Sequence, residues 1–205
     1  MDRLRTQTQP LHDRAEGHEF QRALIKGQLP REAYAAWLGQ MLLVHAALER
    51  RLRALRERSP AVALVVRDEQ FQEPYLLEDL RFFGVDDRTL RTQAGAASLI
   101  AEIEDAAARE PMALLGMHYV LEGSNNGNRF IAMALRKAMG LTPGNGDRYL
   151  DPYGERQRAL WQQFKDDMNS CQFTPVEQEA MLRGAEAMFR GIARVSDDLA
   201  PLVAR

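Results

Sequence analysis

Apolar residues recur every three or four positions along most of the chain, which is the spacing of amphipathic helices. The clearest case runs over residues 30–58, and its apolar positions are Tyr34, Trp37, Leu38, Met41, Leu42, His45, Leu48, Leu52 and Leu55. The opposite face of this segment is rich in arginine. Almost no segment shows the strict alternation of a strand, so the pattern predicts an all-α fold.

Residues that start and end helices divide the rest of the chain. A first helix is predicted to be capped by Thr6 or Thr8 and to end at Gly27. Thr174 opens the last helix with a capping-box pattern. Further helices are predicted over residues 74–83, 93–110, 111–139 and 155–169. We expect seven or eight helices, and because no repeat or linker divides the chain, residues 1–205 should form a single domain.

The helix predicted over residues 111–139 contains a run of small and polar residues: Gly123, Ser124, Asn125, Asn126, Gly127 and Asn128. Each glycine inside a helix costs roughly 1 kcal/mol relative to alanine, and asparagine is a weak helix former. We therefore expect this helix to bend here and to bring its backbone close to a flat ligand or a neighbouring helix. A kink that serves packing alone remains an open alternative.

Composition limits the classes of function. The 27 basic residues are scattered among 29 acidic ones, and a net charge of -2 gives no electrostatic reason to expect nucleic acid. The longest apolar runs fall far short of the roughly 20 residues that span a bilayer, and the polar start has no signal-peptide core. With a single cysteine, Cys171, the chain is expected to be a soluble cytoplasmic protein that binds neither nucleic acid nor membrane.

Four histidines are the main candidates for chemistry. His45 lies on the apolar stripe and is expected to be a satisfied core residue, whereas His18, flanked by acidic residues, is expected to be solvated. His118 and Glu122 are four apart, a spacing that two metal ligands would use, although hydrogen bonding of His118 is the commoner outcome. A di-iron centre would need a Glu-x-x-His pair on each of two helices, and the sequence has none. His12 lies early in the first helix, where its ring would project inward as a lone axial ligand.

Four segments, in the same order along the chain, resemble haem oxygenases. They are residues 11–29 with LHDRAE and KGQL, residues 76–83 with LLEDLRFF, residues 119–124 with YVLEGS, and residues 164–175 with FKDDMNS followed by TP. Each segment is short, but together they cover most of the chain. The chain is therefore identified as a member of this family, which implies a helical bundle with a kinked distal helix over residues 111–139.

The resemblance also implies a function. In the family, the histidine at the position of His12 ligates the haem iron, and haem is both cofactor and substrate. Dioxygen and electrons from a reductase or ferredoxin convert haem to biliverdin, carbon monoxide and ferrous iron. By resemblance, the cofactor-binding residues are Arg5, His12, Glu16, Gly123, Gly127 and Lys165, with His12 on the metal and Arg5 and Lys165 on the propionates. The catalytic segment comprises Gly123, Ser124, Asn125, Asn126, Gly127 and Asn128.

The distal segment departs from the family pattern. Many haem oxygenases carry an aspartate shortly after the first distal glycine and a Gly-Gly pair further on. Here Ser124, Asn125 and Asn126 fill the first stretch, and Gly127-Asn128 replaces the pair. Hydroxyl and carboxamide groups order water without supplying the charge of an aspartate. Two alternatives therefore remain: a non-catalytic protein that stores, senses or delivers haem, and a di-iron oxidase of the same fold.

Overall fold

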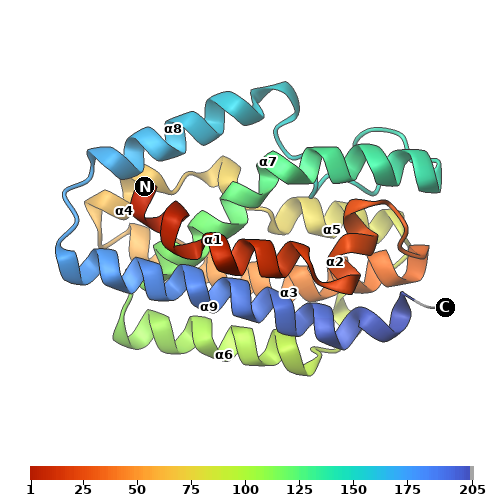
Figure 1. Ribbon diagram of the computed structural model, residues 1–205, viewed down its shortest axis with the longest axis horizontal. Helices are drawn as coiled ribbons and strands as arrows, with labels where there is room; N and C mark the ends of the chain where they lie inside the picture. The colour runs from red at the N-terminus through yellow and green to blue at the C-terminus, as the bar shows by residue number, and fades with distance from the viewer. Residues whose placement is uncertain (204–205) are drawn as a thin grey trace.

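The computed structural model describes residues 1–203, and over that range it contains nine α-helices, four short 3-10 helices and no strand (Figure 1). The α-helices are α1 Asp2–Glu16, α2 Glu19–Ile25, α3 Arg31–Arg56, α4 Pro60–Val65, α5 Glu73–Phe82, α6 Ala94–Arg109, α7 Ala113–Met139, α8 Gln157–Ser170 and α9 Pro175–Leu199. The 3-10 helices are η1 Asp68–Gln70, η2 Asp87–Thr89, η3 Gly154–Arg156 and η4 Ala200–Leu202. The all-α prediction is confirmed.

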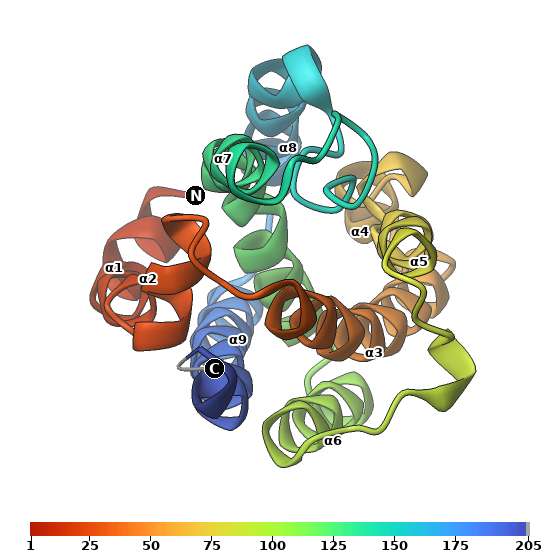
Figure 2. The ribbon, with the colours of Figure 1, turned by 90° about the vertical axis from the view of Figure 1, so that its right-hand side faces the viewer.

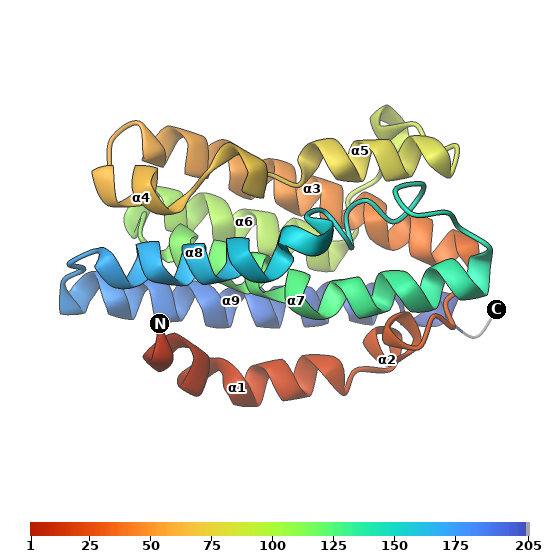
Figure 3. The ribbon, with the colours of Figure 1, turned by 90° about the horizontal axis from the view of Figure 1, so that it is seen from above.

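Helix α9 is the centre of the packing. It contacts α7, α6 and α1, while α3 packs on α5 and α6 from the other side (Figures 2 and 3). A Cβ on Gly116 of α7 would lie 1.8 Å from the Met181 carbonyl oxygen, and one on Gly184 of α9 would lie 1.9 Å from the Ala113 carbonyl oxygen. Helices α7 and α9 therefore cross in direct backbone contact, which only glycine permits at these two positions.

The N-terminal region differs from the prediction. The first helix starts at Asp2 rather than near Thr6, and the Thr8 hydroxyl donates to the Leu4 carbonyl inside the helix instead of capping it. The chain then turns at Gly17, and His18 caps α2 by accepting from the Phe20 amide at 3.2 Å. The His18 ring also lies 2.9 Å from an Asp197 oxygen, so the expectation that His18 is solvated is wrong.

The additional helices explain why nine are present instead of seven or eight. Helix α4 has only six residues, too few for a periodic apolar pattern, and it is capped by the Ser59 hydroxyl. The division of residues 2–25 at Gly17 adds α2. By contrast, the predicted capping box at Thr174 is present, with reciprocal bonds to Glu177. No helix in residues 1–203 combines the length and apolar character needed to cross a membrane.

Helix α7 runs without a break through the polar segment of residues 123–128, although the ribbon changes direction near its middle (Figure 1). The Ser124 hydroxyl donates to the Leu121 carbonyl at 2.7 Å, and the Asn126 amide donates to the Gly123 carbonyl at 2.9 Å. Such back-bonding within a helix occupies side chains that favour turns and tends to bend the helix. The residues expected to interrupt the helix therefore bend it while it stays continuous.

Candidate functional site

His12 follows the buried Leu4 and Thr8 at one-turn intervals, on the side of α1 that packs on α9. Its side chain is nevertheless 47% exposed. Its two ring nitrogens lie 3.6 Å from an Asp13 oxygen and 3.5 Å from a Glu16 oxygen. Beneath it, the ring of Phe189 from α9 meets the imidazole edge on, with 6.0 Å between centroids. The His12 ring is thus held by one aromatic contact and two exposed carboxylates, and much of its surface is free.

Helices α1 and α7 both pack on α9 and run alongside each other (Figure 3). At one end, Arg5 of α1 acts electrostatically on Tyr119 of α7 and opposes the increase in the tyrosine pKa that burial causes. At the other end, Gly27 after α2 approaches the Ala134 backbone so closely that a Cβ would lie 2.8 Å from the carbonyl oxygen. The part of α7 between these contacts lies across from the length of α1 that carries His12.

Several residues on this part of α7 are exposed. We call Ser124, Gly127, Phe130 and Met133 the open face of α7. A Cβ on Gly127 would meet nothing within 4 Å, and the Phe130 and Met133 residues are 72% and 58% exposed. Exposed large apolar side chains beside a glycine with open space are suited to a flat apolar ligand.

Gly123 has a different environment. A Cβ on Gly123 would lie 3.2 Å from the Trp161 indole of α8, which stacks on Phe164 with an interplanar angle of 11°. Tyr119 tilts against the same indole at 5.9 Å. A flat group thus does lie against the backbone here, but that group is a side chain of α8. At Gly123 the geometry favours the packing role, whereas Gly127 remains open.

The predicted propionate partners are both near the surface. Arg5 is exposed, and Lys165 is half-buried on α8. Lys165 follows Phe164, which is fully buried against His118, so its position along α8 is fixed by that packing. Arg5 lies two turns before His12 on α1. The structure therefore places the two cations on different helices and does not join them in one contact.

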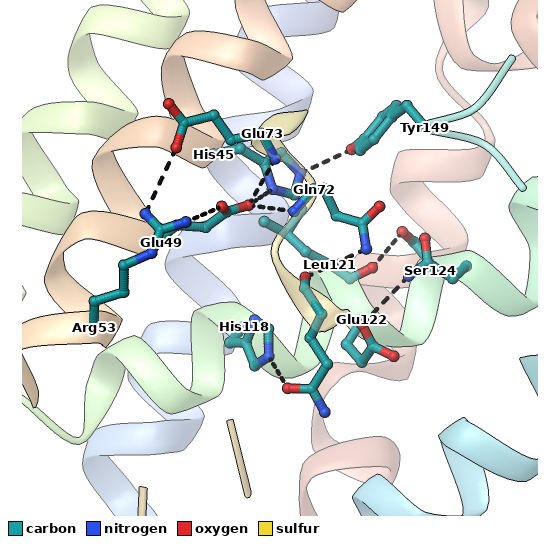
Figure 4. Close-up of polar contacts among 12 residues, drawn as sticks. His45, Glu49, Arg53, Gln72, Glu73, His118, Leu121, Glu122, Ser124 and Tyr149 are labelled. Atoms are coloured by element: carbon teal, nitrogen blue, oxygen red, sulfur yellow. Dashed lines mark hydrogen bonds and ion pairs between the residues drawn. The ribbon is translucent and has the colours of Figure 1, made fainter. Parts of the chain in front are cut away.

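Buried polar residues form a separate cluster on the other side of α7, toward α3 and α5 (Figure 4). His45 bonds Glu49 at 3.0 Å through Nδ1 and Tyr149 at 3.0 Å through Nε2, which confirms that it is a satisfied core histidine. Glu49 Oε1 also accepts the backbone N–H groups of Gln72 at 2.6 Å and Glu73 at 3.2 Å, at the N-terminus of α5. A carboxylate is stabilised there by the free amides and the helix dipole.

His118 and Glu122 belong to this buried side, but they do not converge on one point. His118 Nε2 lies 3.0 Å from Gln70 Oε1, and burial lowers the pKa of His118 to about 4. Glu122 Oε2 accepts the Tyr153 hydroxyl at 2.9 Å, and burial raises the pKa of Glu122 to about 7, opposed by bonds from Tyr153 and Asn125. Over residues 1–203, no group of three or more His, Cys, Asp or Glu residues is arranged to hold a metal ion.

Sequence patterns missed several residues near the candidate site. Phe189 and Trp161 lie on the apolar stripes of their helices, so nothing in the sequence separated them from core residues. Tyr153 comes from the loop before η3, and its contact with Glu122 joins positions 31 residues apart. The spacing of Glu122 from His118 predicted a shared helix face, but it did not reveal the contact with Tyr153.

The residues present fit a haem group in the space beside α7. Haem requires an accessible axial imidazole, an apolar wall and a close backbone approach. His12 supplies an exposed imidazole, Phe130 and Met133 supply exposed apolar surface, and Gly127 leaves the backbone uncovered. Glu16 lies where a carboxylate can accept the second ring N–H of His12 and fix its orientation.

Comparison with known proteins gives one consistent family. The family model described as Heme oxygenase matches residues 1–198. Heme oxygenase 1 of Pongo abelii is 26% identical over 193 residues, which are 91% of this chain and 66% of that protein. Heme oxygenase 2 of Synechocystis is 24% identical over 208 residues, covering 98% of this chain and 83% of that one. The chain thus spans slightly less than two thirds of the length of the Pongo abelii relative.

Solved structures agree on the fold. The Synechocystis heme oxygenase-1 structure in complex with heme has a TM-score of 0.90 at 20% identity, covering 99% of this chain and 93% of that one. The Synechocystis heme oxygenase-2 structure in complex with heme and NO has a TM-score of 0.91 at 23% identity, covering 98% and 85%. A domain of unknown function from Shewanella denitrificans with the same fold has a TM-score of 0.75 at 16% identity, covering 98% and 91%.

Proposed function

Because this chain belongs to the heme oxygenase family, we propose that it binds haem between α1 and α7 and cleaves it with dioxygen to biliverdin, carbon monoxide and ferrous iron. The observation that carries the proposal is the 47% exposed imidazole of His12, alongside an open α7 backbone at Gly127. The two solved relatives with heme, at TM-scores of 0.90 and 0.91, support haem as the ligand of this fold.

Each residue of the site has a role in this proposal. His12 would bind the iron through one ring nitrogen, and a carboxylate beside the other would make the imidazole a stronger ligand; Glu16 lies 3.5 Å from Nε2 and Asp13 lies 3.6 Å from Nδ1. Phe130 and Met133 exclude water from the apolar plate, while Arg5 and Lys165 pair with the two propionates. Bound haem supplies the iron at which dioxygen is reduced. The electrons come from a soluble reductase or ferredoxin in the cytoplasm.

The polar side chains of α7 order the water through which protons reach the dioxygen. Ser124 is exposed, and Asn128 donates to its Oγ at 3.2 Å, so the pair offers hydrogen-bonding groups to ordered water. Gly127 supplies the close backbone approach. Because Trp161 covers Gly123, the plate lies toward Gly127 and Phe130.

The experiment supplies purified protein with haem, an electron donor and dioxygen and follows bilin absorbance in the red. The proposal expects bilin formation together with loss of the Soret band. His12→Ala should lose the histidine-ligated Soret band and all turnover. His18→Asn is the matched control, because asparagine preserves the cap of α2 and the His18 ring is bonded to Asp197 of α9; this variant should bind haem normally.

A second candidate is a non-catalytic haem-binding protein, and one observation favours it. Glu122 is the only acidic residue of α7, and it is 2% exposed and points away from the open face. If haem binds through His12 but stays intact with reductant and dioxygen over many minutes, this second function replaces the first. Failure of haem to bind the wild-type protein would reject both.

A further inference from the structure

The polar side chains of α7 form one hydrogen-bonded series from the buried side of the helix to its open face. Asn125 Nδ2 donates to Glu122 Oε2 at 3.4 Å, and Asn128 Nδ2 donates to Asn125 Oδ1 at 3.4 Å and to Ser124 Oγ at 3.2 Å. Glu122 and Asn125 are each 2% exposed, Asn128 is half-buried, and Ser124 is exposed. The series therefore connects a carboxyl that water does not reach with a hydroxyl that it does.

The direction of this series is set at its buried end. Glu122 Oε2 accepts two bonds, from Tyr153 and Asn125, while Oε1 has no partner among residues 1–203. Because Glu122 Oε2 is a hydrogen-bond acceptor, Asn125 must present its NH₂ group to Glu122. Its carbonyl oxygen then faces Asn128. Asn128 must then use its NH₂ group on Asn125 and Ser124.

The open face is left with a defined polarity. The Ser124 hydroxyl proton is committed to the Leu121 carbonyl at 2.7 Å, and both Asn128 N–H groups are occupied. The free groups are a Ser124 lone pair and the Asn128 carboxamide oxygen, which are acceptors. An acceptor at this place binds one proton of a water and leaves the other proton of that water to point outward. The bonds of Asn125 to Glu122 and of Asn128 to Asn125 are both 3.4 Å and longer than usual, so the acceptor at Glu122 decides which way the Asn125 amide faces.

We propose that Glu122 is a positioning residue that orients Asn125 and Asn128 and thereby fixes the hydrogen-bonding polarity of the open face of α7 at Ser124. Its role in haem turnover rests on the proposed function, but the orientation itself is a property of the protein without haem. Glu122 lies on the buried side of α7, and the open face of α7 carries no acidic residue. Glu122 therefore acts through the side-chain amides of Asn125 and Asn128 and does not touch the proposed haem.

Ionised Glu122 should hold Asn125 more strongly than neutral Glu122, since charge-assisted bonds are roughly twice as strong as neutral ones. The groups that act on its charge are Tyr153 from the loop before η3 and Glu69 of η1, and Glu69 is itself paired at 3.4 Å with Arg156 of η3. The Tyr153 bond lowers the Glu122 pKa, and Glu69 raises it.

The test uses the haem-free protein, labelled with nitrogen-15, and follows the side-chain amide resonances of Asn125 and Asn128 by NMR from about pH 5.5 to about pH 8.5. The expected result is that both amides shift with one midpoint near the Glu122 pKa of about 7. Glu122→Gln should abolish the shift in both. Glu69→Gln is the matched control: it should keep the shift and move its midpoint to lower pH.

Asn125→Ala separates transmission through the amide from a long-range electrostatic effect. The Glu122 carboxyl, observed by carbon-13, should still titrate in this variant, while the Asn128 amide should become independent of pH. An Asn128 amide that does not titrate in the wild-type protein, or that still titrates in Asn125→Ala, overturns the proposal. The wild-type and Asn125→Ala titrations decide the matter even if Glu122→Gln does not fold.

With haem bound, Glu122→Gln should change the pH profile of haem turnover and lower its rate about fivefold, the effect of losing one hydrogen bond of about 1 kcal/mol. Haem affinity should stay within about twofold, because Glu122 lies away from the ligand. Absence of haem binding in the wild-type protein would reject the proposed function while leaving the amide titration to judge the orientation. An unchanged pH profile with normal turnover would reject the role in catalysis.

Discussion

The two sides of α7 use the same residue types in opposite ways. On the buried side, His45 bonds through both nitrogens and Glu49 accepts from a histidine, an arginine and two backbone amides. By contrast, His12 has one aromatic contact and two exposed carboxylates beside it, and a Cβ on Gly127 would meet nothing within 4 Å. Polar groups whose hydrogen bonds are satisfied stabilise the fold, whereas groups without partners are available to a ligand. This difference indicates that the ligand site lies on the side of α7 that carries the open face.

Substitution of Gly116, on the side of α7 that packs on α9, should have the largest effect on stability. Gly116→Ala would place a Cβ 1.8 Å from the Met181 carbonyl oxygen, and the α9 backbone has no room to yield. We expect a loss of more than about 3 kcal/mol in the free energy of unfolding, or failure to fold. Urea denaturation of the purified variant measures it. A loss below about 1 kcal/mol would show that α7 and α9 do not cross this closely.

Glu49→Ala should have the next largest effect. It removes the acceptor for the buried His45 ring and for the first amides of α5, at the buried Gln72 and the half-buried Glu73. Leaving such donors unpaired should cost about 3 kcal/mol of unfolding free energy. Glu104→Ala, which removes an exposed partner of Arg50 and Arg51, is the control and should cost less than about 1 kcal/mol. Equal losses in the two variants would contradict a structural role for the buried side.

His118 and Glu122 predict opposite pH dependences of stability. The His118 pKa falls from 6.5 to about 4 on folding, so the unfolded state binds more protons and stability is lost as pH falls from about 6.5 toward 4. The Glu122 pKa rises from 4.5 to about 7, so the folded state binds more protons and stability is lost as pH rises from about 4.5 toward 7.

Thermal unfolding over this pH range tests both assignments. His118→Gln should remove the loss on the acid side, and Glu122→Gln should remove the loss between about pH 4.5 and pH 7. If Glu122→Gln leaves the melting temperature profile unchanged, Glu122 is not a buried acid. If His118→Gln still loses stability as pH falls from about 6.5 toward 4, a group other than His118 is responsible for that loss.

Gly127→Ala should have the smallest effect on stability and a clear effect on ligand binding. A methyl group there meets nothing within 4 Å, and alanine favours helix, so the haem-free protein should gain up to about 1 kcal/mol. The same methyl group would stand where the proposed ligand approaches, so haem affinity should fall. Urea denaturation measures the stability of the haem-free protein, and a haem titration of the same preparation measures the affinity for haem. Increased stability with unchanged haem affinity would place haem elsewhere.

Periodic apolar residues predicted the long helices well, because a helix such as α3 buries one stripe over many turns. They failed at α4, which has six residues, and at the start of α1, where the Thr8 hydroxyl bonds inside the helix instead of capping it. Asn and Gly propensities predicted a bend in α7, and the helix does change direction there (Figure 1). It stays continuous because Ser124 and Asn126 bond back to helix carbonyls.

The candidate site was predictable only in part. His12 lies in one of the matched segments and Gly127 in the run of small and polar residues, and the structure gives both of them free space. The neighbours that give the site its shape were not visible in the sequence, because Trp161 and Phe189 look like core residues until α8 and α9 are placed. The contact of Glu122 with Tyr153 depends on how the loop before η3 folds back, which no spacing encodes.

The most direct test is a haem titration of the wild-type protein, His12→Ala and His18→Asn, followed by absorbance and by the electron paramagnetic resonance of the ferric iron. The account predicts a histidine-ligated spectrum in the wild-type protein and in His18→Asn, and its loss in His12→Ala. Added imidazole should restore the ligated spectrum in His12→Ala. A histidine-ligated spectrum in His12→Ala without added imidazole would contradict the central claim, since the iron would then be held by another residue.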